Sequence, residues 1–210
     1  MFMHHTNHLS IRALFALLLV ITAGACGPAD ERGESQDSTD TDGVSMIAGE
    51  APSLAAYKAL FPDEGSQGWP TPYLWKEAPE LVVEKWLTDE PQIAGKFVIL
   101  DFWATWCTPC LAMIPKLNQL QEQFGDRLVI IGISEEAEDV VRAFAGLPIG
   151  YALAIDTKKR LQENYRVAGL PYGVLIDPAG RVVYQGYGLD AEIVRKVLAV
   201  DTGVSIDSGG

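Results

Sequence analysis

Histidine is nearly absent from this chain of 210 residues, and its few positions limit the chemistry open to the protein. The three histidines, His4, His5 and His8, all lie in a segment that we expect to be removed. The rest of the chain then carries no imidazole. This excludes Cys-His nucleophile pairs, histidine-ligated metal sites and histidine-ligated haem.

Basic residues are also scarce. The chain has 16 Lys and Arg against 28 Asp and Glu, which gives a formal net charge of −12 at pH 7. The sequence shows no basic patch, no arginine-rich helix and no internal repeat. We therefore expect no nucleic acid among its partners.

The apolar run near the N-terminus, residues 13–21 (ALFALLLVI), is too short for a comfortable membrane span of about 20 residues. It follows Arg12, the only charged residue of the first 25, and precedes Ala23-Gly24-Ala25, the small residues that a signal peptidase requires. We predict that residues 1–25 are a signal peptide, with an uncleaved anchor as the alternative. Removing Arg12 with this peptide leaves 15 basic residues against 28 acidic ones, a net charge of −13.

Cysteine occurs three times, and the first, Cys26, directly follows the small residues at 23–25. Ala-Gly-Ala-Cys resembles a bacterial lipobox, although Ala23 stands where leucine is usual. Lipidation of Cys26 would explain the odd third cysteine, and ordinary cleavage that leaves a free thiol is the alternative. Residues 26–50 are rich in Ser, Asp, Glu, Thr and Gly, which predicts a disordered acidic tether after the lipidated cysteine. Residues 201–210 predict a second flexible tail.

Residues 51–200 are long enough for one domain with a hydrophobic core. The apolar patterns predict strands at residues 81–86, 97–103, 128–133 and 151–155, a hairpin at 173–184, and helices at 111–124, 135–144, 158–165 and 191–200. This alternation predicts an α/β fold, a central mixed sheet flanked by helices. Residues 51–80 form an N-terminal extension of this domain. We interpret its aromatic stretch 69–75 (WPTPYLW) as packing over the sheet edge, with a partner-docking surface as the alternative.

Two cysteines, Cys107 and Cys110, stand three residues apart where the apolar strand 97–103 gives way to a helix. Such a pair can form and break one disulfide with little movement, and the helix N-terminus favours a thiolate at Cys107. We predict that Cys107 is the attacking thiol and that Cys110, which we expect to be less exposed, is the resolving thiol. A structural disulfide would close a very small loop and stabilise little, and a zinc site would need two more ligands where only Cys26 is left. We therefore predict no metal, and no cofactor other than the Cys107–Cys110 disulfide.

Thr108 and Pro109 lie between the two thiols and bring no cation to them. Pro109 also removes one N–H group that could have hydrogen-bonded to the sulfur. Strongly oxidising dithiols of this kind depend on an unusually stable reduced thiolate. We therefore predict a reducing or intermediate potential.

Asp101 interrupts the apolar strand six residues before Cys107. A carboxyl group in that setting should be desolvated and have a raised pKa, which suits it to exchange a proton with Cys110. The alternative is an aspartate at a solvated strand end. Asp101 is our third candidate catalytic residue, after the two cysteines.

Taken together, these motifs resemble a known family. The chain is similar to thioredoxin-fold proteins of the membrane-tethered, extracytoplasmic thiol-disulfide oxidoreductase group, called TlpA-like or ResA-like. The likeness covers about residues 81–200 and rests on Gly95-Lys96, the block from Asp101 to Cys110, Pro115, Gly169-Leu170-Pro171 and the hairpin from Asp177 to Gly180. It implies a thioredoxin fold.

The resemblance also implies roles for single residues. Pro171 matches the family's cis-proline, which faces the disulfide and lets the backbone beside it pair with a substrate segment; sequence alone would predict a trans bond. Leu170 offers an apolar contact, and Trp106 is expected to shield the disulfide. With Thr108 and Pro109 these residues form the expected substrate-binding set. The lysine that partners the buried acid in thioredoxins has no counterpart in residues 128–133.

The function that follows is a thiol-disulfide oxidoreductase on the outer face of a membrane, periplasmic or at the cell surface. Its expected partners are protein thiols or disulfides, apocytochrome c among them by the family resemblance, and a membrane electron donor. One alternative is a disulfide-forming oxidase or isomerase. Another is a tethered partner-binding protein with incidental redox activity. A peroxide-reducing protein is disfavoured because the Pro-x-x-x-Thr-x-x-Cys pattern of peroxiredoxins is missing.

Overall fold

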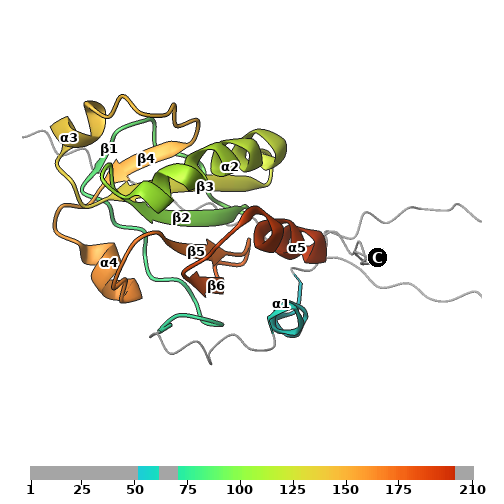
Figure 1. Ribbon diagram of the computed structural model, residues 1–210. Coiled ribbons are helices and arrows are strands. Elements are labelled where there is room, and N and C mark those ends of the chain that lie inside the picture. The colour runs from blue at the N-terminus through green and yellow to red at the C-terminus, as the bar shows by residue number, and fades with distance from the viewer. Residues whose placement is uncertain (1–51, 62–70, 202–210) are drawn as a thin grey trace, which may run out of the picture. The chain divides into compact units, whose positions relative to one another are not determined.

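The structure is a computed structural model that describes residues 52–61 and 71–201 (Figure 1). The predicted signal peptide, Cys26, the tether at 26–50 and the tail beyond residue 201 lie outside these ranges. Within the described residues, no helix is both long enough and apolar enough to cross a bilayer.

A six-stranded mixed sheet forms the centre of the domain, in the order β1-β4-β3-β2-β5-β6. Its strands are β1 (Lys85–Trp86), β2 (Phe97–Trp103), β3 (Leu128–Ser134), β4 (Ala152–Ile155), β5 (Tyr172–Ile176) and β6 (Val182–Gly186). β2, β3 and β4 are parallel, while β1, β5 and β6 pair antiparallel with their neighbours. Because every residue of β2 and β3 is buried, both strands read as nearly continuous apolar runs, which Asp101 interrupts in β2. The α/β mixed sheet predicted from the sequence is confirmed.

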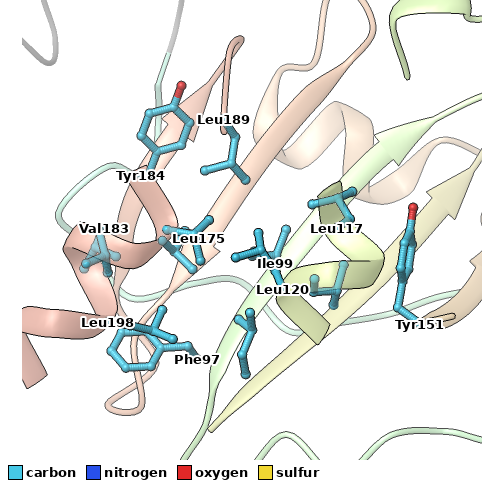
Figure 2. Close-up of a cluster of buried hydrophobic side chains, with 14 of the residues drawn as sticks. Phe97, Ile99, Leu117, Leu120, Tyr151, Leu175, Val183, Tyr184, Leu189 and Leu198 are labelled. Carbon is cyan, nitrogen blue, oxygen red and sulfur yellow. The ribbon is translucent and has the colours of Figure 1, made fainter. Parts of the chain in front are cut away.

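Helices cover both faces of this sheet (Figure 1). They are α1 (Leu54–Leu60), α2 (Thr108–Phe124), α3 (Glu138–Arg142), α4 (Arg160–Tyr165) and α5 (Ala191–Asp201). Side chains alternate along β2, so Phe97 and Ile99 pack with residues of α2 and α5 (Figure 2). Leu100 and Phe102 pack on the other face with residues of α4. Asp101 therefore shares the face of the sheet that α2 covers.

The predicted first strand, residues 81–86, is wrong for most of its length, because β1 has only two residues. β1 pairs antiparallel with β4, with Lys85 opposite Ile155, the last residue of β4. Glu84 still donates its backbone N–H to the carbonyl of Ile155, and residues 81–83 run past that end of β4. Leu81 and Val83 pack instead against the core on the α4 face.

The predicted hairpin is present as β5 and β6, with Gly180 in its turn at φ +80°, a left-handed conformation that glycine adopts without strain. The N-terminal extension lies along the outer edge of β6. Trp75 donates its backbone N–H to the carbonyl of Val182, and Val182 donates in return to Lys76. This pairing confirms the sheet-edge interpretation for the described part of the aromatic stretch. α1, which the sequence analysis did not predict, belongs to the same extension and buries Tyr57 completely.

Candidate active site

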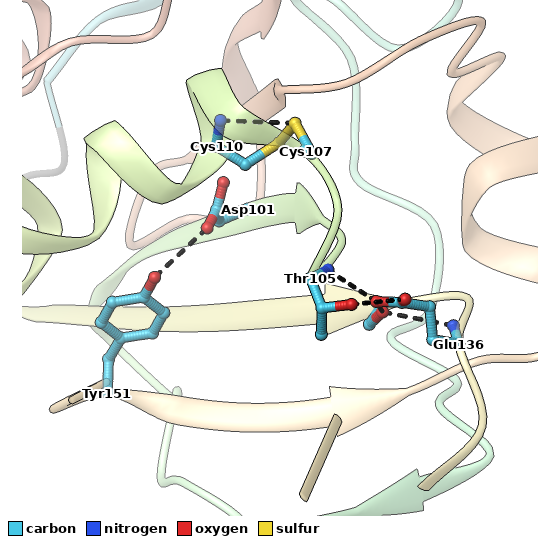
Figure 3. Close-up of a disulfide and its surroundings, with 7 residues drawn as sticks. Asp101, Thr105, Cys107, Cys110, Glu136 and Tyr151 are labelled. Carbon is cyan, nitrogen blue, oxygen red and sulfur yellow. Dashed lines mark hydrogen bonds between the residues drawn. A yellow bond between two sulfur atoms is a disulfide. The ribbon is translucent and has the colours of Figure 1, made fainter. Parts of the chain in front are cut away.

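Cys107 and Cys110 lie at the junction of β2 and α2, as the sequence predicts, and form a disulfide with their Cα atoms 5.2 Å apart (Figure 3). Cys107 is the N-cap of α2, and its Sγ accepts a hydrogen bond of 3.3 Å from the backbone N–H of Cys110. The same donor would stabilise a thiolate at Cys107 after reduction. Cys110 was expected to be less exposed than Cys107. In this oxidised state the difference is small, because Cys107 is 3% exposed and Cys110 is 1% exposed.

Exposed and half-buried side chains surround the disulfide. Trp106 is 67% exposed, and Thr108 and Pro109 are exposed as well. Leu170 packs against the cluster that contains both cysteines, and the Leu170–Pro171 bond is cis, as the family resemblance implied. Trp106 therefore faces solvent next to Cys107.

A groove of about 360 Å³ lies beside the disulfide, with Trp106 and Leu170 in its lining. Charged side chains of α4, of its flanking residues and of the loop after β3 complete its wall, among them the ion pair of Lys159 with Glu135 at 2.9 Å. The structure thus brings together two of the five residues expected to bind substrate, Trp106 and Leu170, in one groove. Thr108, Pro109 and Pro171 do not line it.

Asp101 is buried in the middle of the sheet and only 7% exposed. Its neighbours in register are both glycines, Gly132 on β3 and Gly173 on β5. Burial raises the pKa of Asp101 to about 7, and a hydrogen bond from Tyr151 opposes part of that rise. The solvated strand end considered as an alternative is therefore wrong. A carboxyl group with a pKa near neutrality can both take up and release a proton under ordinary conditions.

Sequence reasoning missed Tyr151. It lies just before β4, and its hydroxyl donates to Oδ2 of Asp101 at 3.4 Å (Figure 3). Burial, followed by the negative charge of Asp101, raises the pKa of Tyr151 above its usual value, so the phenol stays protonated and acts as a donor. A tyrosine 50 residues from Asp101 in sequence gives no local signal of this contact.

A second missed contact holds the loop that leads into Cys107. Glu136 accepts hydrogen bonds of 2.7 Å from the backbone N–H and from Oγ1 of Thr105, and one of 3.2 Å from Ser134 (Figure 3). These contacts place Glu136 in the loop after β3. As a result α3 begins at Glu138, not at residue 135 as predicted. We call Thr105, Ser134 and Glu136 the carboxylate clamp.

Comparisons with known proteins agree with this geometry. The AhpC/TSA family matches residues 77–185. Thiol-disulfide oxidoreductase ResA from Bacillus thuringiensis (strain Al Hakam) is 31% identical over 151 residues, which are 69% of this chain and 84% of that protein. Thioredoxin-like protein YneN from Bacillus subtilis (strain 168) is 36% identical over 91 residues, 41% of this chain and about half of YneN (53%).

Among solved structures, a thiol-disulfide isomerase from Corynebacterium glutamicum superposes with a TM-score of 0.51 at 21% identity. It covers 60% of this chain and 96% of its own, which supports the thioredoxin-like fold. Together the fold, the Cys107–Cys110 disulfide and these relatives show that this chain belongs to the AhpC/TSA family and is a thioredoxin-like thiol-disulfide oxidoreductase.

Proposed function

We propose that this protein works outside the cytoplasm, tethered to a membrane through lipidated Cys26, and that it reduces disulfides in protein clients such as apocytochromes c. The observation that carries the redox part is Cys107 at the N-cap of α2, bonded to Cys110 and packed against Leu170. The tether and the compartment rest on the signal-peptide pattern and the Ala-Gly-Ala-Cys sequence.

The exchange proceeds in two steps. The Cys107 thiolate attacks one sulfur of a client disulfide, which forms a mixed disulfide and releases the first client thiolate. Cys110 then attacks Sγ of Cys107, which releases the second client thiolate and closes the Cys107–Cys110 disulfide. Two electrons pass to the client, and the enzyme disulfide is reduced again by a membrane dithiol through the same exchange in reverse.

Asp101 serves the second step in this proposal. Cys110 must lose its proton to become a nucleophile, and it lies in the first turn of α2 above the buried carboxyl group (Figure 3). Because the pKa of Asp101 is raised to about 7 by burial, its carboxylate is basic enough to accept that proton. The proton then leaves with the released client thiol.

The client binds beside the disulfide in this proposal. Trp106 and Leu170 give apolar contact in the groove, Thr108 and Pro109 form the exposed rim of the helix start, and the backbone before Pro171 pairs with an extended client segment.

The reducing direction is supported by what surrounds Cys107. Among the described residues, the hydrogen bond to its Sγ comes from one backbone N–H, that of Cys110, and Pro109 has no N–H to offer. A thiolate with few stabilising contacts favours an intermediate or low reduction potential.

Trapping and turnover test this function. Cys107→Ser should abolish insulin-disulfide reduction driven by dithiothreitol, because the attacking thiol is gone. Cys110→Ser, expressed in the native host, should instead accumulate a covalent adduct through Cys107, since the resolving thiol is missing. Wild-type protein and the Cys107→Ser/Cys110→Ser double variant are the controls.

Two results would contradict this function. A Cys110→Ser protein that forms no adduct while Cys107 is freely alkylated would argue against catalytic exchange and for a tethered binding protein. A reduction potential close to about −120 mV, the value of a strong periplasmic oxidant, would reverse the proposed direction in favour of an oxidase.

A further inference from the structure

The contact between Tyr151 and Asp101 spans two strands of the sheet. Asp101 lies on β2, β3 is its neighbour, and Tyr151 directly precedes β4 on the far side of β3. Adjacent strands are about 4.8 Å apart, so the two backbones are separated by about 10 Å. A tyrosine ring can cover that distance only where the strand between carries no side chain on the same face.

Gly132 supplies this opening. It is the register partner of Asp101 on one side and of Leu153 on the other, so it lies on the line that joins them. A Cβ atom built on Gly132 would lie 3.1 Å from Cε2 of Tyr151, 3.0 Å from Nε1 of Trp103 and 2.8 Å from Cδ2 of Leu153. The three side chains therefore occupy the space that a larger residue at 132 would need.

Asp101 meets few other polar groups. From α2 it faces the Cys107–Cys110 disulfide, and β5 presents Gly173, over which Leu189 packs with its Cβ 2.7 Å from the position of an added Cβ. The small cavity of about 50 Å³ next to Asp101 is otherwise lined by apolar side chains and Tyr172. The hydroxyl of Tyr172 is bonded to Gln185 among residues of the opposite face.

We propose that Tyr151 is the positioning residue of the buried acid: its hydroxyl, reaching across Gly132, holds the Asp101 carboxyl group beneath the disulfide and sets the pH at which Asp101 exchanges its proton. Residues 128–133 hold no lysine, and the hydrogen-bond donor to Asp101 is this neutral phenol from the far side of β3. The inference rests on the proposed function only where it concerns the role of Asp101 in turnover.

A neutral donor has a different effect from a lysine. A phenol hydroxyl stabilises the carboxylate by one hydrogen bond and adds no positive charge, so it lowers the pKa of Asp101 less than a buried ammonium group would. With the hydroxyl removed, burial acts alone, and the pKa of Asp101 moves further upward.

The direct test is the titration of Asp101 in oxidised Tyr151→Phe protein, followed by NMR of the aspartate carboxyl carbons and assigned with Asp101→Asn. We expect the midpoint to rise by about half to one pH unit relative to the wild type, since the 3.4 Å contact is long for a hydrogen bond. The matched control is Tyr165→Phe. Tyr165 is also buried, but its hydroxyl has no hydrogen-bond partner among the described residues, so the midpoint of Asp101 should stay in place.

The functional test is the pH dependence of single-turnover insulin reduction by the same two variants. The Tyr151→Phe profile should shift to higher pH together with the Asp101 midpoint, and the Tyr165→Phe profile should match that of the wild type. An unchanged midpoint in Tyr151→Phe would overturn the proposal, whatever the activity.

The two proposals fail in different ways. A midpoint that rises in Tyr151→Phe, while the wild-type protein reduces no insulin, would refute the proposed function and leave Tyr151 as the group that holds Asp101. A midpoint that rises while the reduction profile stays fixed would overturn the claim that this contact governs proton exchange.

Gly132→Ala tests the contact between Tyr151 and Asp101 by a second substitution. The added Cβ should displace the Tyr151 ring and raise the Asp101 midpoint, although Trp103 and Leu153 must also shift. Combined with Tyr151→Phe, it should add little to the midpoint, because the hydroxyl is already gone. An additive rise in the double variant would contradict the proposed route across Gly132.

Discussion

Asp101 is buried among glycines and apolar side chains, so ionising its carboxyl group works against folding. The unfolded chain has an aspartate pKa of about 3.9, whereas burial raises that of folded Asp101 to about 7. The folded state therefore holds its proton more tightly, and stability is lost as the pH rises from about 4 to about 7. At one pKa unit per 1.36 kcal/mol, the loss approaches about 4 kcal/mol as an upper bound.

Replacing this acid should stabilise the protein. Asp101→Asn keeps an oxygen that can accept from Tyr151 but cannot ionise. In urea unfolding of the oxidised protein we expect it to gain about 1–4 kcal/mol over the wild type at pH 8, and the gain should disappear near pH 4. Insulin reduction by the same variant should slow, because Cys110 has lost its proton acceptor.

Asp177→Asn is the matched control for that experiment. Asp177 is 1% exposed, but it accepts hydrogen bonds from the backbone of Ala179 and from the backbone and side chain of Arg181. Its carboxylate is therefore compensated, and neutralising it should destabilise the protein at pH 8. If Asp177→Asn stabilised the protein at pH 8, or Asp101→Asn destabilised it, the buried charge of Asp101 could not be the group that opposes folding.

Single residues with a local signature were predictable. Cys107 and Cys110 stand out by spacing, Asp101 by interrupting an apolar strand, and Pro171 by the family resemblance. Tyr151 could not be found in this way, because its meeting with Asp101 depends on the register of three strands. In hindsight Gly132, a glycine inside a buried strand, is a signal that some other group passes close to the backbone.

At the scale of elements, the carboxylate clamp ties the end of β2 to the loop after β3. Glu136 receives two hydrogen bonds of 2.7 Å from Thr105, two residues before the attacking cysteine. Its own backbone N–H donates to Ser134, the last residue of β3. The loop that carries Cys107 is thereby held to the sheet at a point outside the disulfide itself.

Glu136→Gln should loosen this connection. An amide offers one acceptor oxygen where the carboxylate offers two, so the Thr105 hydroxyl must turn from donor to acceptor and both Thr105 hydrogen bonds lose their charge assistance. We expect a loss of about 1–3 kcal/mol in the free energy of unfolding and faster amide exchange at Thr105 and Trp106.

Glu138→Gln is the control, because Glu138 forms exposed ion pairs with Lys85 and Arg142. Its urea midpoint should stay close to that of the wild type. Equal effects of the two substitutions would argue that the clamp contributes no more than a surface ion pair.

The long elements were easier to predict than the short ones. β2, β3 and the body of α2 agree with their predicted ranges because their apolar runs are unambiguous. β1 was predicted too long because the length of a strand also depends on its partner, and β4 ends at Ile155. The helix predicted from residue 135 starts later because Glu136 is engaged by Thr105, a contact that no helical pattern reveals.

For the molecule as a whole, the fold and the redox class were predictable from the motif block, whereas the helix α1 within the N-terminal extension was not. Ser53 is the N-cap of α1, but its side chain makes no capping hydrogen bond and the first turn has no acidic residue, so the signal of a helix start is weak. Its position follows from tertiary contacts of Tyr57 with the core.

Cys26→Ala tests the tether in the intact protein. If Cys26 carries the lipid, the wild type should sediment with membranes and incorporate labelled palmitate in its native host, while Cys26→Ala should do neither. Cys107→Ser, which leaves Cys26 intact, should remain in the membrane fraction. Membrane association of Cys26→Ala without lipid label would point instead to the uncleaved anchor.

The near-complete burial of both disulfide sulfurs, next to an exposed Trp106, also determines which reductants are fast. A small thiol must attack sulfurs that are almost fully buried, and it gains almost nothing from contact with Trp106 or Leu170. An extended protein segment can gain apolar contact with both before any bond changes. Protein partners that fit the groove therefore have a contact advantage over low-molecular-weight thiols such as dithiothreitol, which must be supplied in excess to drive the exchange.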